Sequence, residues 1–420
     1  MLEATLLPGP LRLPPSSPFV GRAAELGRLR ALVPRGADDG RRIALVGGEA
    51  GSGKSRLVRE LAQAVAADGV TVLYGACDAV VRTPYQPFAD ALGRLVRSTD
   101  AAALRADLGA TGGELARLLP ELRTLVGDLS AAAAADPDTE RHRLHAAVAD
   151  LLGGAGARAP VLIVVEDLHW ADGATLLLLR HLARSTDGRV LVVATFRDTE
   201  AEVPPGLADA LADLRRADDV VRLHLAGLGE ADVTEFVRRA SGARVDREGR
   251  GLVRALRDLT EGNAFLLCEL WRALVEREAV VVRDGCVAPV VPPAEIAAPD
   301  GVREVVGQRL ARLEDDTRAL LELAAVAGPA FELTLLRAAA PEAVGRLDAL
   351  EPAVRGGLVE ELPGRALAYR FTHELVRRAL YDGLGGVRRA ELHLRIAEAL
   401  ERAAPEPDGR ALADLAHHFA

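Results

Sequence analysis

The residues best suited to chemistry lie in one stretch, Gly48-Glu49-Ala50-Gly51-Ser52-Gly53-Lys54-Ser55. Glycines let a backbone turn its N–H groups inward around phosphate oxygens, and a helix that starts there points its positive dipole end at them. Lys54 adds a mobile charge near the outer phosphates, and Ser55 can hold Mg²⁺. The pattern predicts a phosphate-binding loop (P-loop) whose nucleotide-binding residues are Gly48, Gly51, Ser52, Gly53, Lys54, Ser55 and Arg56.

Lys54 is the only lysine in a chain with 52 lysines and arginines together. The sequence therefore uses arginine wherever a generic positive charge suffices. A compact ammonium on a flexible stem reaches into a loop around a phosphate, whereas a planar guanidinium fits poorly there. This exception favours a phosphate-binding role for Lys54 over a chance glycine-rich turn.

A second group of polar residues follows two apolar runs. Glu166 and Asp167 come directly after residues 161–165, and Arg197 follows residues 190–194. P-loop enzymes place at such strand ends the acids that hold Mg²⁺ and polarise the attacking water. The candidate catalytic residues are therefore Glu166, Asp167 and Arg197, and the candidate Mg²⁺ ligands are Ser55, Glu166 and Asp167.

The P-loop and these polar residues can act together only if the strands that precede them end at the same edge of one sheet. Five apolar runs predict strands, at residues 42–46, 70–74, 161–165, 190–194 and 220–225. Amphipathic runs between them predict helices, and the helix after the P-loop is expected to end at Ala67. This alternation predicts an α/β fold with a doubly wound parallel sheet, interrupted by a helical insertion between Phe88 and Leu152.

After Leu228 the strand signals stop. Helical periods run to about Glu278, and a hairpin is expected at residues 280–290. Further helices combined with a second hairpin around Pro363-Gly364 suggest a winged helix. The expected parts are an extended, proline-rich lead-in (1–18), a P-loop NTPase domain (19–227), an all-α helical lid with a linker (228–300), a winged-helix domain (301–404) and the truncated start of a helical-repeat region (405–420).

Composition excludes several classes of protein. A net charge of −9 argues against broad electrostatic attachment to nucleic acid or acidic lipid. Cys77, Cys268 and Cys286 are odd in number and lack ligand-like spacing, which indicates reduced thiols in a cytoplasmic protein. No apolar run approaches the roughly 18 residues that span a bilayer, so we expect no membrane partner.

Six motifs stand in a characteristic order: Phe19-Val20-Gly21-Arg22, the P-loop, Val164-Val165-Glu166-Asp167-Leu168-His169-Trp170-Ala171-Asp172, Thr195-Phe196-Arg197-Asp198, Gly262-Asn263-Ala264-Phe265 and Arg370-Phe371-Thr372-His373-Glu374-Leu375. Together they resemble the ATPase core of the STAND regulators, which are signal-transduction ATPases with numerous domains. The resemblance spans about residues 19 to 420. It is greatest to large ATP-binding regulators of the LuxR and antibiotic-regulator type, whose core resembles the AAA modules of origin-recognition proteins.

The resemblance implies roles for individual residues. Val20, Gly21 and Arg22 would border the adenine and ribose, and Arg197 would be the first sensor. Asn263 would lie over the base from the lid, although the family's usual proline after Gly-Asn is replaced by alanine. His373 stands where related switch ATPases place a histidine on the bound nucleotide's phosphate, and a partly buried structural histidine is the alternative.

The prediction for function is a switch that binds ATP or ADP with Mg²⁺ and serves as the core of a signal-responsive, transcriptional regulator. Slow hydrolysis is expected because Asp167 is shorter than the glutamate that fast motors usually have. Self-association when ATP is bound is also expected, with an inducer or protein partner that the sequence does not identify.

Two other functions stay open. One is a DNA-binding initiator that reads duplex DNA with its winged helix. Residues 301–400 hold 14 arginines and 15 acidic residues, a poor electrostatic footprint for DNA, so we expect no direct DNA binding. The other is a kinase or the ATPase module of an effector such as a cyclase, but no second catalytic constellation supports phosphoryl transfer.

Overall fold

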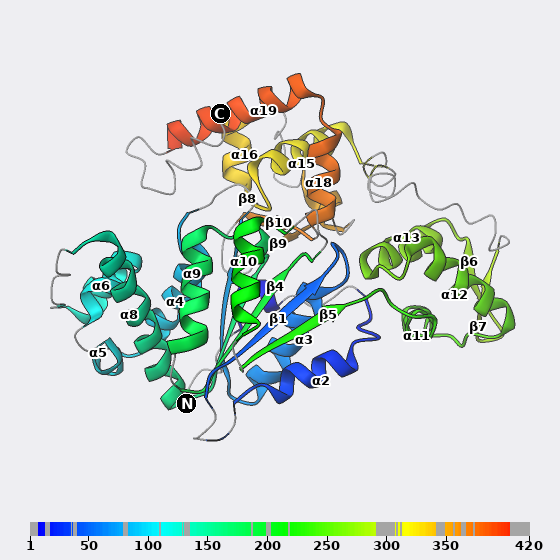
Figure 1. Ribbon diagram of the computed structural model, residues 1–420. Coiled ribbons are helices and arrows are strands. Elements are labelled where there is room, and N and C mark those ends of the chain that lie inside the picture. Colours follow the sequence, from blue (N-terminus) through cyan, green and yellow to red (C-terminus); the bar gives the residue numbers. More distant parts are fainter. Residues whose placement is uncertain are drawn as a thin grey trace.

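The structure of the chain is a computed structural model, shown in Figure 1. It describes residues 7–403 with the exception of residues 13–16, 35, 37–39, 79–82, 109–110, 128, 130–134, 186–187, 199–202, 217–218, 291–306, 308–309, 311–312, 342–348, 356–357, 363–366 and 373.

A five-stranded parallel sheet forms the core of the larger part (Figure 1). Its strand order is β2-β3-β4-β1-β5, so β4 lies between the strand that leads into the P-loop and the strand that ends at Glu166. Every residue of β3 and β4 is buried, as a parallel sheet covered on both faces requires. The strands are β1 (Arg42–Gly48), β2 (Thr71–Ala76), β3 (Val161–Glu166), β4 (Val190–Phe196) and β5 (Val220–Leu225).

Helices cover both faces of this sheet. Ile43 and Leu45 of β1 belong to one apolar core, while Ala44 and Val46 belong to the other, which is the alternation expected of a strand. The helices α2 (Ala23–Ala31) and α3 (Lys54–Ala67) contribute to the second core. The first core contains α4 (Gln86–Ser98), α5 (Ala101–Leu108), α6 (Gly112–Leu118), α7 (Glu121–Val126), α8 (Pro137–Arg158), α9 (Gly173–Ser185) and α10 (Pro205–Leu214).

The lid follows β5 and has its own apolar core. It consists of α11 (Glu230–Ser241), α12 (Arg247–Thr260) and α13 (Ala264–Glu276). The predicted hairpin is present as β6 (Val280–Arg283) and β7 (Cys286–Pro289). Val287 of this hairpin is buried in the lid core, so the lid is helical with one hairpin packed on it.

The last part combines helices with a three-stranded antiparallel sheet, as in a winged helix. The sheet has the order β8-β10-β9, and its apolar core includes Phe331, Tyr369 and Phe371. The elements are α15 (Asp315–Ala327), β8 (Ala330–Glu332), α16 (Leu333–Ala339), α17 (Glu351–Arg355), β9 (Val359–Glu361), β10 (Ala368–Phe371), α18 (Glu374–Gly383) and α19 (Gly386–Ala403).

The sequence-based fold class is confirmed, including the five strands, the end of α3 at Ala67 and the hairpin β9–β10. The extended lead-in was wrong in part, because α1 (Gly9–Arg12) is a helical turn whose Leu11 is buried against the sheet domain. Strand β8 was not predicted. The proline linker at 292–299, the Pro363-Gly364 turn, His373 and residues 405–420 lie outside the described residues, and the exact domain boundaries stay predictions.

Candidate nucleotide-binding site

The P-loop joins β1 to α3 and has the backbone that a phosphate cradle requires. Gly51 and Gly53 have φ angles of +84° and +95°, which favour glycine. Helix α3 begins directly afterwards, at Lys54. The loop therefore brings backbone N–H groups and the positive end of a helix to one place.

Lys54 is held inside this loop. Its Nζ donates hydrogen bonds to Gly48 O at 2.8 Å and to Glu49 O at 2.7 Å, and its side chain is largely buried. The ammonium thus braces the loop from which it would reach a phosphate. Ser55, in the first turn of α3, is exposed and accessible to a metal ion.

Sheet topology brings the predicted catalytic residues to the same edge as the P-loop. Parallel strands end at a common edge, and β4 separates β1 from β3. The backbone N–H of Asp167 donates a hydrogen bond to Thr195 Oγ1 at 3.0 Å, which joins the ends of β3 and β4. Asp167 has a left-handed backbone with φ of +59°. The turn after β3 is therefore fixed next to the strand that carries Arg197.

Glu166 is buried and has a partner that the sequence reasoning missed. Tyr74 of β2 donates a hydrogen bond from its hydroxyl to Glu166 Oε2 at 2.7 Å. Burial, followed by the Glu166 charge, raises the pKa of Tyr74 well above its usual value, so the phenol stays protonated as a donor. The other oxygen, Oε1, is buried without a hydrogen-bond partner among the described residues. The pairing of β2 with β3 brings Tyr74 near Glu166, and this pairing was not predicted from the sequence.

Arg197 is buried at the end of β4, where its guanidinium lies 5.3 Å from the centre of the Trp170 ring. The next residue, Asp198, pairs with His224 of β5 at 2.6 Å between Oδ2 and Nδ1. Arg197 thus lies at the same sheet edge as the P-loop. Its contact with a phosphate stays a prediction.

Residues 17–22, directly before α2, contact both the P-loop and the lid. Val20 is buried in the lid core. Gly21, with φ of +68°, lies so close to Asp232 of α11 that a Cβ atom would be 2.6 Å from its Cγ. Arg22 Nη2 donates to Ser52 O at 3.3 Å and to Ala226 O at 2.5 Å. Arg22 therefore ties the P-loop to the end of β5, and the adenine and ribose contacts of these three residues stay predictions.

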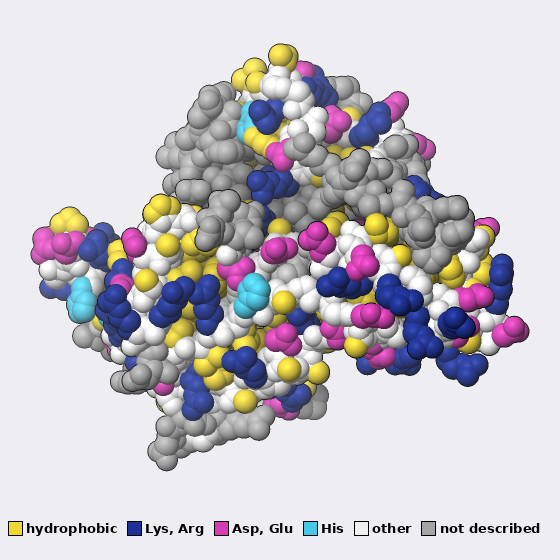
Figure 2. All heavy atoms as spheres, turned by 45° about the vertical axis from the view of Figure 1, so that its right-hand side comes forward, with side chains coloured by type: hydrophobic (Ala, Val, Ile, Leu, Met, Phe, Trp, Pro, Cys, Tyr) yellow, Lys and Arg dark blue, Asp and Glu magenta, His cyan; other side chains and the backbone are white. Residues whose placement is uncertain are grey.

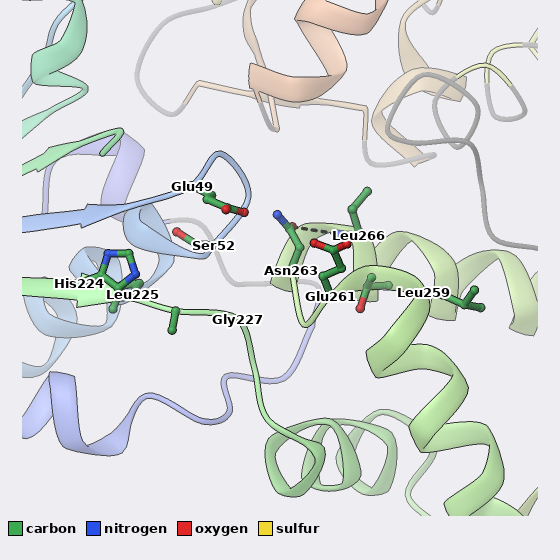
Figure 3. Close-up of a pocket in the computed structure, with 11 residues that line it drawn as sticks. Glu49, Ser52, His224, Leu225, Gly227, Leu259, Glu261, Asn263 and Leu266 are labelled. Atoms are coloured by element: carbon green, nitrogen blue, oxygen red, sulfur yellow. Dashed lines mark hydrogen bonds between the residues drawn. The ribbon is translucent and has the colours of Figure 1, made fainter. Parts of the chain in front are cut away.

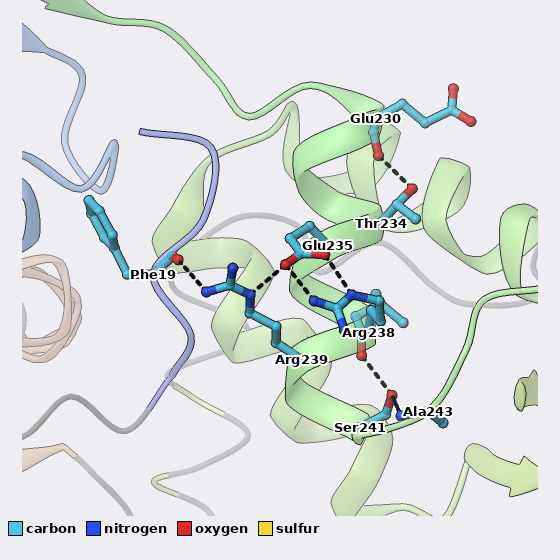
Figure 4. A network of polar contacts seen from close by, with 9 residues as sticks. Phe19, Glu230, Thr234, Glu235, Arg238, Arg239, Ser241 and Ala243 are labelled. Carbon is cyan, nitrogen blue, oxygen red and sulfur yellow. Dashed lines mark hydrogen bonds and ion pairs between the residues drawn. The ribbon is translucent and has the colours of Figure 1, made fainter. Parts of the chain in front are cut away.

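Two arginines fasten the same segment. Arg56 of α3 donates to Ser17 O at 3.1 Å and lies 5.6 Å from the Phe19 ring centre. Arg239 of α11 donates to Phe19 O at 3.4 Å, as Figure 4 shows. Glu235 binds both Arg238 and Arg239, and their hydrogen bonds lower the pKa of Glu235 to about 2. The segment is thereby attached to the P-loop helix and to the lid.

Asn263 joins the lid to the P-loop. Its Oδ1 accepts hydrogen bonds from the N–H groups of Phe265 and Leu266 and so caps α13. Its Nδ2 donates to Ala50 O at 2.8 Å, and the Phe265 N–H also donates to Gly51 O at 3.0 Å. The first turn of α13 therefore lies directly on the phosphate-binding loop. The predicted contact of Asn263 with the base is not tested by these bonds.

A cavity of about 490 Å³ lies beside the P-loop. Figure 3 shows Asn263 and Glu261 on the α12–α13 turn, with Glu49 and Ser52 on the P-loop across from them. Asn263 lines this cavity, whereas Val20, Gly21 and Arg22 do not. The lining residues are Glu49, Ser52, His224, Leu225, Ala226, Gly227, Leu259, Thr260, Glu261, Asn263 and Leu266.

The residues present fit a nucleotide with Mg²⁺. The glycine backbone and Lys54 suit phosphates, while the unpartnered buried oxygen of Glu166 suits a metal ion or its water. In the described part of the chain, no three His, Cys, Asp or Glu side chains are grouped to hold a metal by themselves. Mg²⁺ bound here would take the remaining ligands from phosphate oxygens and water.

Among the described helices, none is long and apolar enough to cross a membrane.

Comparison with known proteins agrees with this geometry. Residues 18–193 match the AAA ATPase domain family. An uncharacterized protein of Rhizobium meliloti is 27% identical over 407 residues, covering 92% of this chain and 37% of its own length. The chain therefore spans little more than a third of that relative.

Two solved structures are similar. A STAND protein with a tetratricopeptide repeat sensor, from Pyrococcus horikoshii, matches 96% of this chain and 48% of its own chain, with 16% identity and a TM-score of 0.55. The ORC2 protein of Aeropyrum pernix, in ADPNP and ADP complexes, matches 92% of this chain and 96% of its own at 15% identity, with a TM-score of 0.38. At 16% identity the first match shows the shared fold alone. Residues 18–193 thus match an AAA ATPase domain, within a fold that the chain shares with a STAND ATPase.

Proposed function

We propose that this chain is a nucleotide-dependent switch, the regulatory core of a signal-responsive and transcriptional regulator of the STAND type. ADP holds a closed form in which the winged helix lies against the nucleotide domain. Exchange to ATP releases the winged helix and allows self-association. The observation that carries this proposal is the position of Phe265.

Phe265 belongs to two parts of the molecule at once. Its backbone N–H donates to Gly51 O in the P-loop at 3.0 Å. Its side chain packs against the apolar core of the winged helix. A change in P-loop backbone on nucleotide exchange would therefore reach the winged helix directly through Phe265.

The P-loop residues Gly48, Gly51, Ser52, Gly53, Lys54, Ser55 and Arg56 would hold the nucleotide. When bound, Mg²⁺ would neutralise phosphate charge, with Ser55, Glu166 and Asp167 as its protein contacts. Arg197 would sense the terminal phosphate by contacting it. Asp167 has a shorter reach than glutamate, which supports slow hydrolysis. The resemblance assigns His373 to the nucleotide phosphate from the winged-helix side.

The DNA-binding alternative has less support. Residues 301–400 have a net charge of −1. On the face shown in Figure 2, basic and acidic side chains are interspersed and do not form a continuous basic stripe. A protein that binds duplex DNA through phosphates needs such a stripe.

The test of the switch is substitution at Phe265. Phe265→Ala removes the ring from the winged-helix core but keeps the backbone bond to the P-loop. We expect ADP to bind within a few-fold of wild type and to dissociate faster, with increased protease cleavage between the lid and the winged helix. Phe265→Leu, which retains an apolar contact, should behave like wild type. Equal ADP release and equal protease sensitivity in Phe265→Ala and wild type would contradict the proposal.

A further inference from the structure

Helix α1 is held on the P-loop helix by packing and by a hydrogen bond. Leu11 of α1 is only 2% exposed and belongs to the same apolar core as Leu57 and Leu61 of α3. The side-chain amide of Gln63, also on α3, donates from Nε2 to Leu11 O at 3.1 Å. A helix of four residues is not stable by itself, so these contacts with α3 keep α1 in place.

Helix α1 also contacts the winged helix. Arg370 of β10 donates from Nη2 to Pro10 O at 3.2 Å. Side chains alternate between the faces of a strand, and Tyr369 and Phe371 are buried in the winged-helix core, so Arg370 lies on the opposite face. In Figure 1, β9 and β10 lie on the side of the winged helix nearest the five-stranded sheet. Helix α1 therefore lies between α3 and β10.

Two consecutive carbonyl groups of α1 have partners in different parts of the molecule. The last carbonyls of a helix lack partners within it and need donors from elsewhere. Leu11 O takes its donor from the P-loop helix, and Pro10 O takes its donor from the winged helix. The Arg370 guanidinium is also paired with Glu360 of β9, and the Arg370 side chain is only 18% exposed. The bond to Pro10 O is thus charge-assisted and comes from a side chain with a fixed orientation.

We propose that α1 is a latch, a segment that holds the winged helix docked on the nucleotide domain as long as Leu11 stays packed against α3. The inference rests on the proposed switch and adds an element that stabilises its closed form. Helix α3 starts at Lys54 in the P-loop, so the latch connects the winged helix to the helix that would contact phosphate. It acts at a second place besides Phe265, whose side chain reaches the winged-helix core from the lid.

Two substitutions release the latch from opposite ends. Leu11→Ala weakens its packing on α3, whereas Arg370→Met removes the donor to Pro10 O and leaves Leu11 in the core. Each should increase the rate of ADP release by roughly 10-fold, as expected for loss of one charge-assisted hydrogen bond. The double variant should release ADP no faster than the faster single variant, because both changes break the same connection.

Two matched controls keep the connection. Leu11→Met retains an apolar side chain of similar volume and should pack as leucine does. Glu360→Gln removes the ion pair of Arg370 but leaves the bond to Pro10 O. Both controls should release ADP at the wild-type rate.

The measurements are stopped-flow release of a fluorescent ADP analogue and small-angle X-ray scattering of the full chain, with and without ADP. We expect a larger radius of gyration in Leu11→Ala and in Arg370→Met than in the wild type and both controls. Wild-type scattering in both variants would overturn the latch, and so would additive effects on ADP release in the double variant. An equal change in Glu360→Gln would also overturn it, because the ion pair of Arg370 would then be the cause. If the wild type binds no ADP, the proposed function fails, whereas scattering of the nucleotide-free chain still decides whether α1 holds the winged helix.

Discussion

Asn263 and Ala50 are 213 residues apart in the sequence, and a hydrogen bond of 2.8 Å from Asn263 Nδ2 to Ala50 O joins them. The same side chain caps α13 through its other atom, Oδ1. The approach is so close that a Cβ atom on Gly51 would lie 2.5 Å from Asn263 Oδ1. One amide therefore sets both where the lid helix begins and where it contacts the P-loop.

Two substitutions separate these two tasks. Asn263→Ala removes the cap and the P-loop bond, and should lower the free energy of unfolding by about 1 kcal/mol from the cap alone. Asn263→Asp retains the cap acceptor but has no donor for Ala50 O. We expect Asn263→Asp to remain near wild type in thermal unfolding and to release ADP faster. If Asn263→Asp releases ADP at the wild-type rate, the amide acts only as a helix cap.

Lys54→Ala should abolish ADP and ATP binding while the fold is kept. Lys54 Nζ donates to the loop carbonyls of Gly48 and Glu49, so its ammonium acts within the P-loop. ADP at 100 times its Kd stabilises a protein by about 2.7 kcal/mol. Differential scanning calorimetry should show this stabilisation in the wild type and in a Leu394→Ala surface control, but not in Lys54→Ala. Wild-type stabilisation in Lys54→Ala would refute the P-loop assignment.

Glu166→Gln and Asp167→Asn should each reduce ATP turnover far more than ADP binding. Both acids are expected to act through Mg²⁺ and water, whereas the P-loop binds the phosphates. Single-turnover hydrolysis and ADP affinity measured on the same samples check this. Normal hydrolysis in both variants would show that other residues do the chemistry.

The stability of the lid should depend on pH through Glu269 of α13. Burial raises the pKa of Glu269 to about 7, against a smaller lowering by Arg272 and a further increase by Glu276. The folded state then holds a proton that the unfolded chain loses above about pH 4.5, so stability falls as pH rises from about 4.5 to 7. Over this pH range the free energy of unfolding falls by at most about 3 kcal/mol. Glu269→Gln should flatten this part of the stability curve, and an unchanged slope in urea unfolding would exclude Glu269 as its source.

Local sequence patterns were sufficient to predict most of the fold. The apolar run before Glu166 predicted β3, and the amphipathic run after the P-loop predicted α3 with its end at Ala67. Strand β8 was missed because its three residues are too short for an alternating pattern to be recognised. Helix α1 was missed because its glycine and proline suggest extended chain, and it is the burial of Leu11 against the sheet domain that stabilises the turn.

The contacts between the parts were not predictable in this way. Tyr74, Arg370 and Phe265 all occur in segments that the sequence analysis identified, but their partners are far away in the chain. The alternation of Tyr369, Arg370 and Phe371 signals only that Arg370 faces away from the winged-helix core. Its contact with Pro10 follows from how the winged helix lies on α1, which no local pattern contains.

The central claim is that nucleotide exchange moves the winged helix, and small-angle X-ray scattering tests it most directly. The full chain is measured with saturating ADP and then with a non-hydrolysable ATP analogue, each with MgCl₂, at protein concentrations low enough to keep one copy per particle. The account predicts a larger radius of gyration with the ATP analogue than with ADP, and no difference in Lys54→Ala. Identical scattering curves for the two nucleotides in the wild type would contradict it.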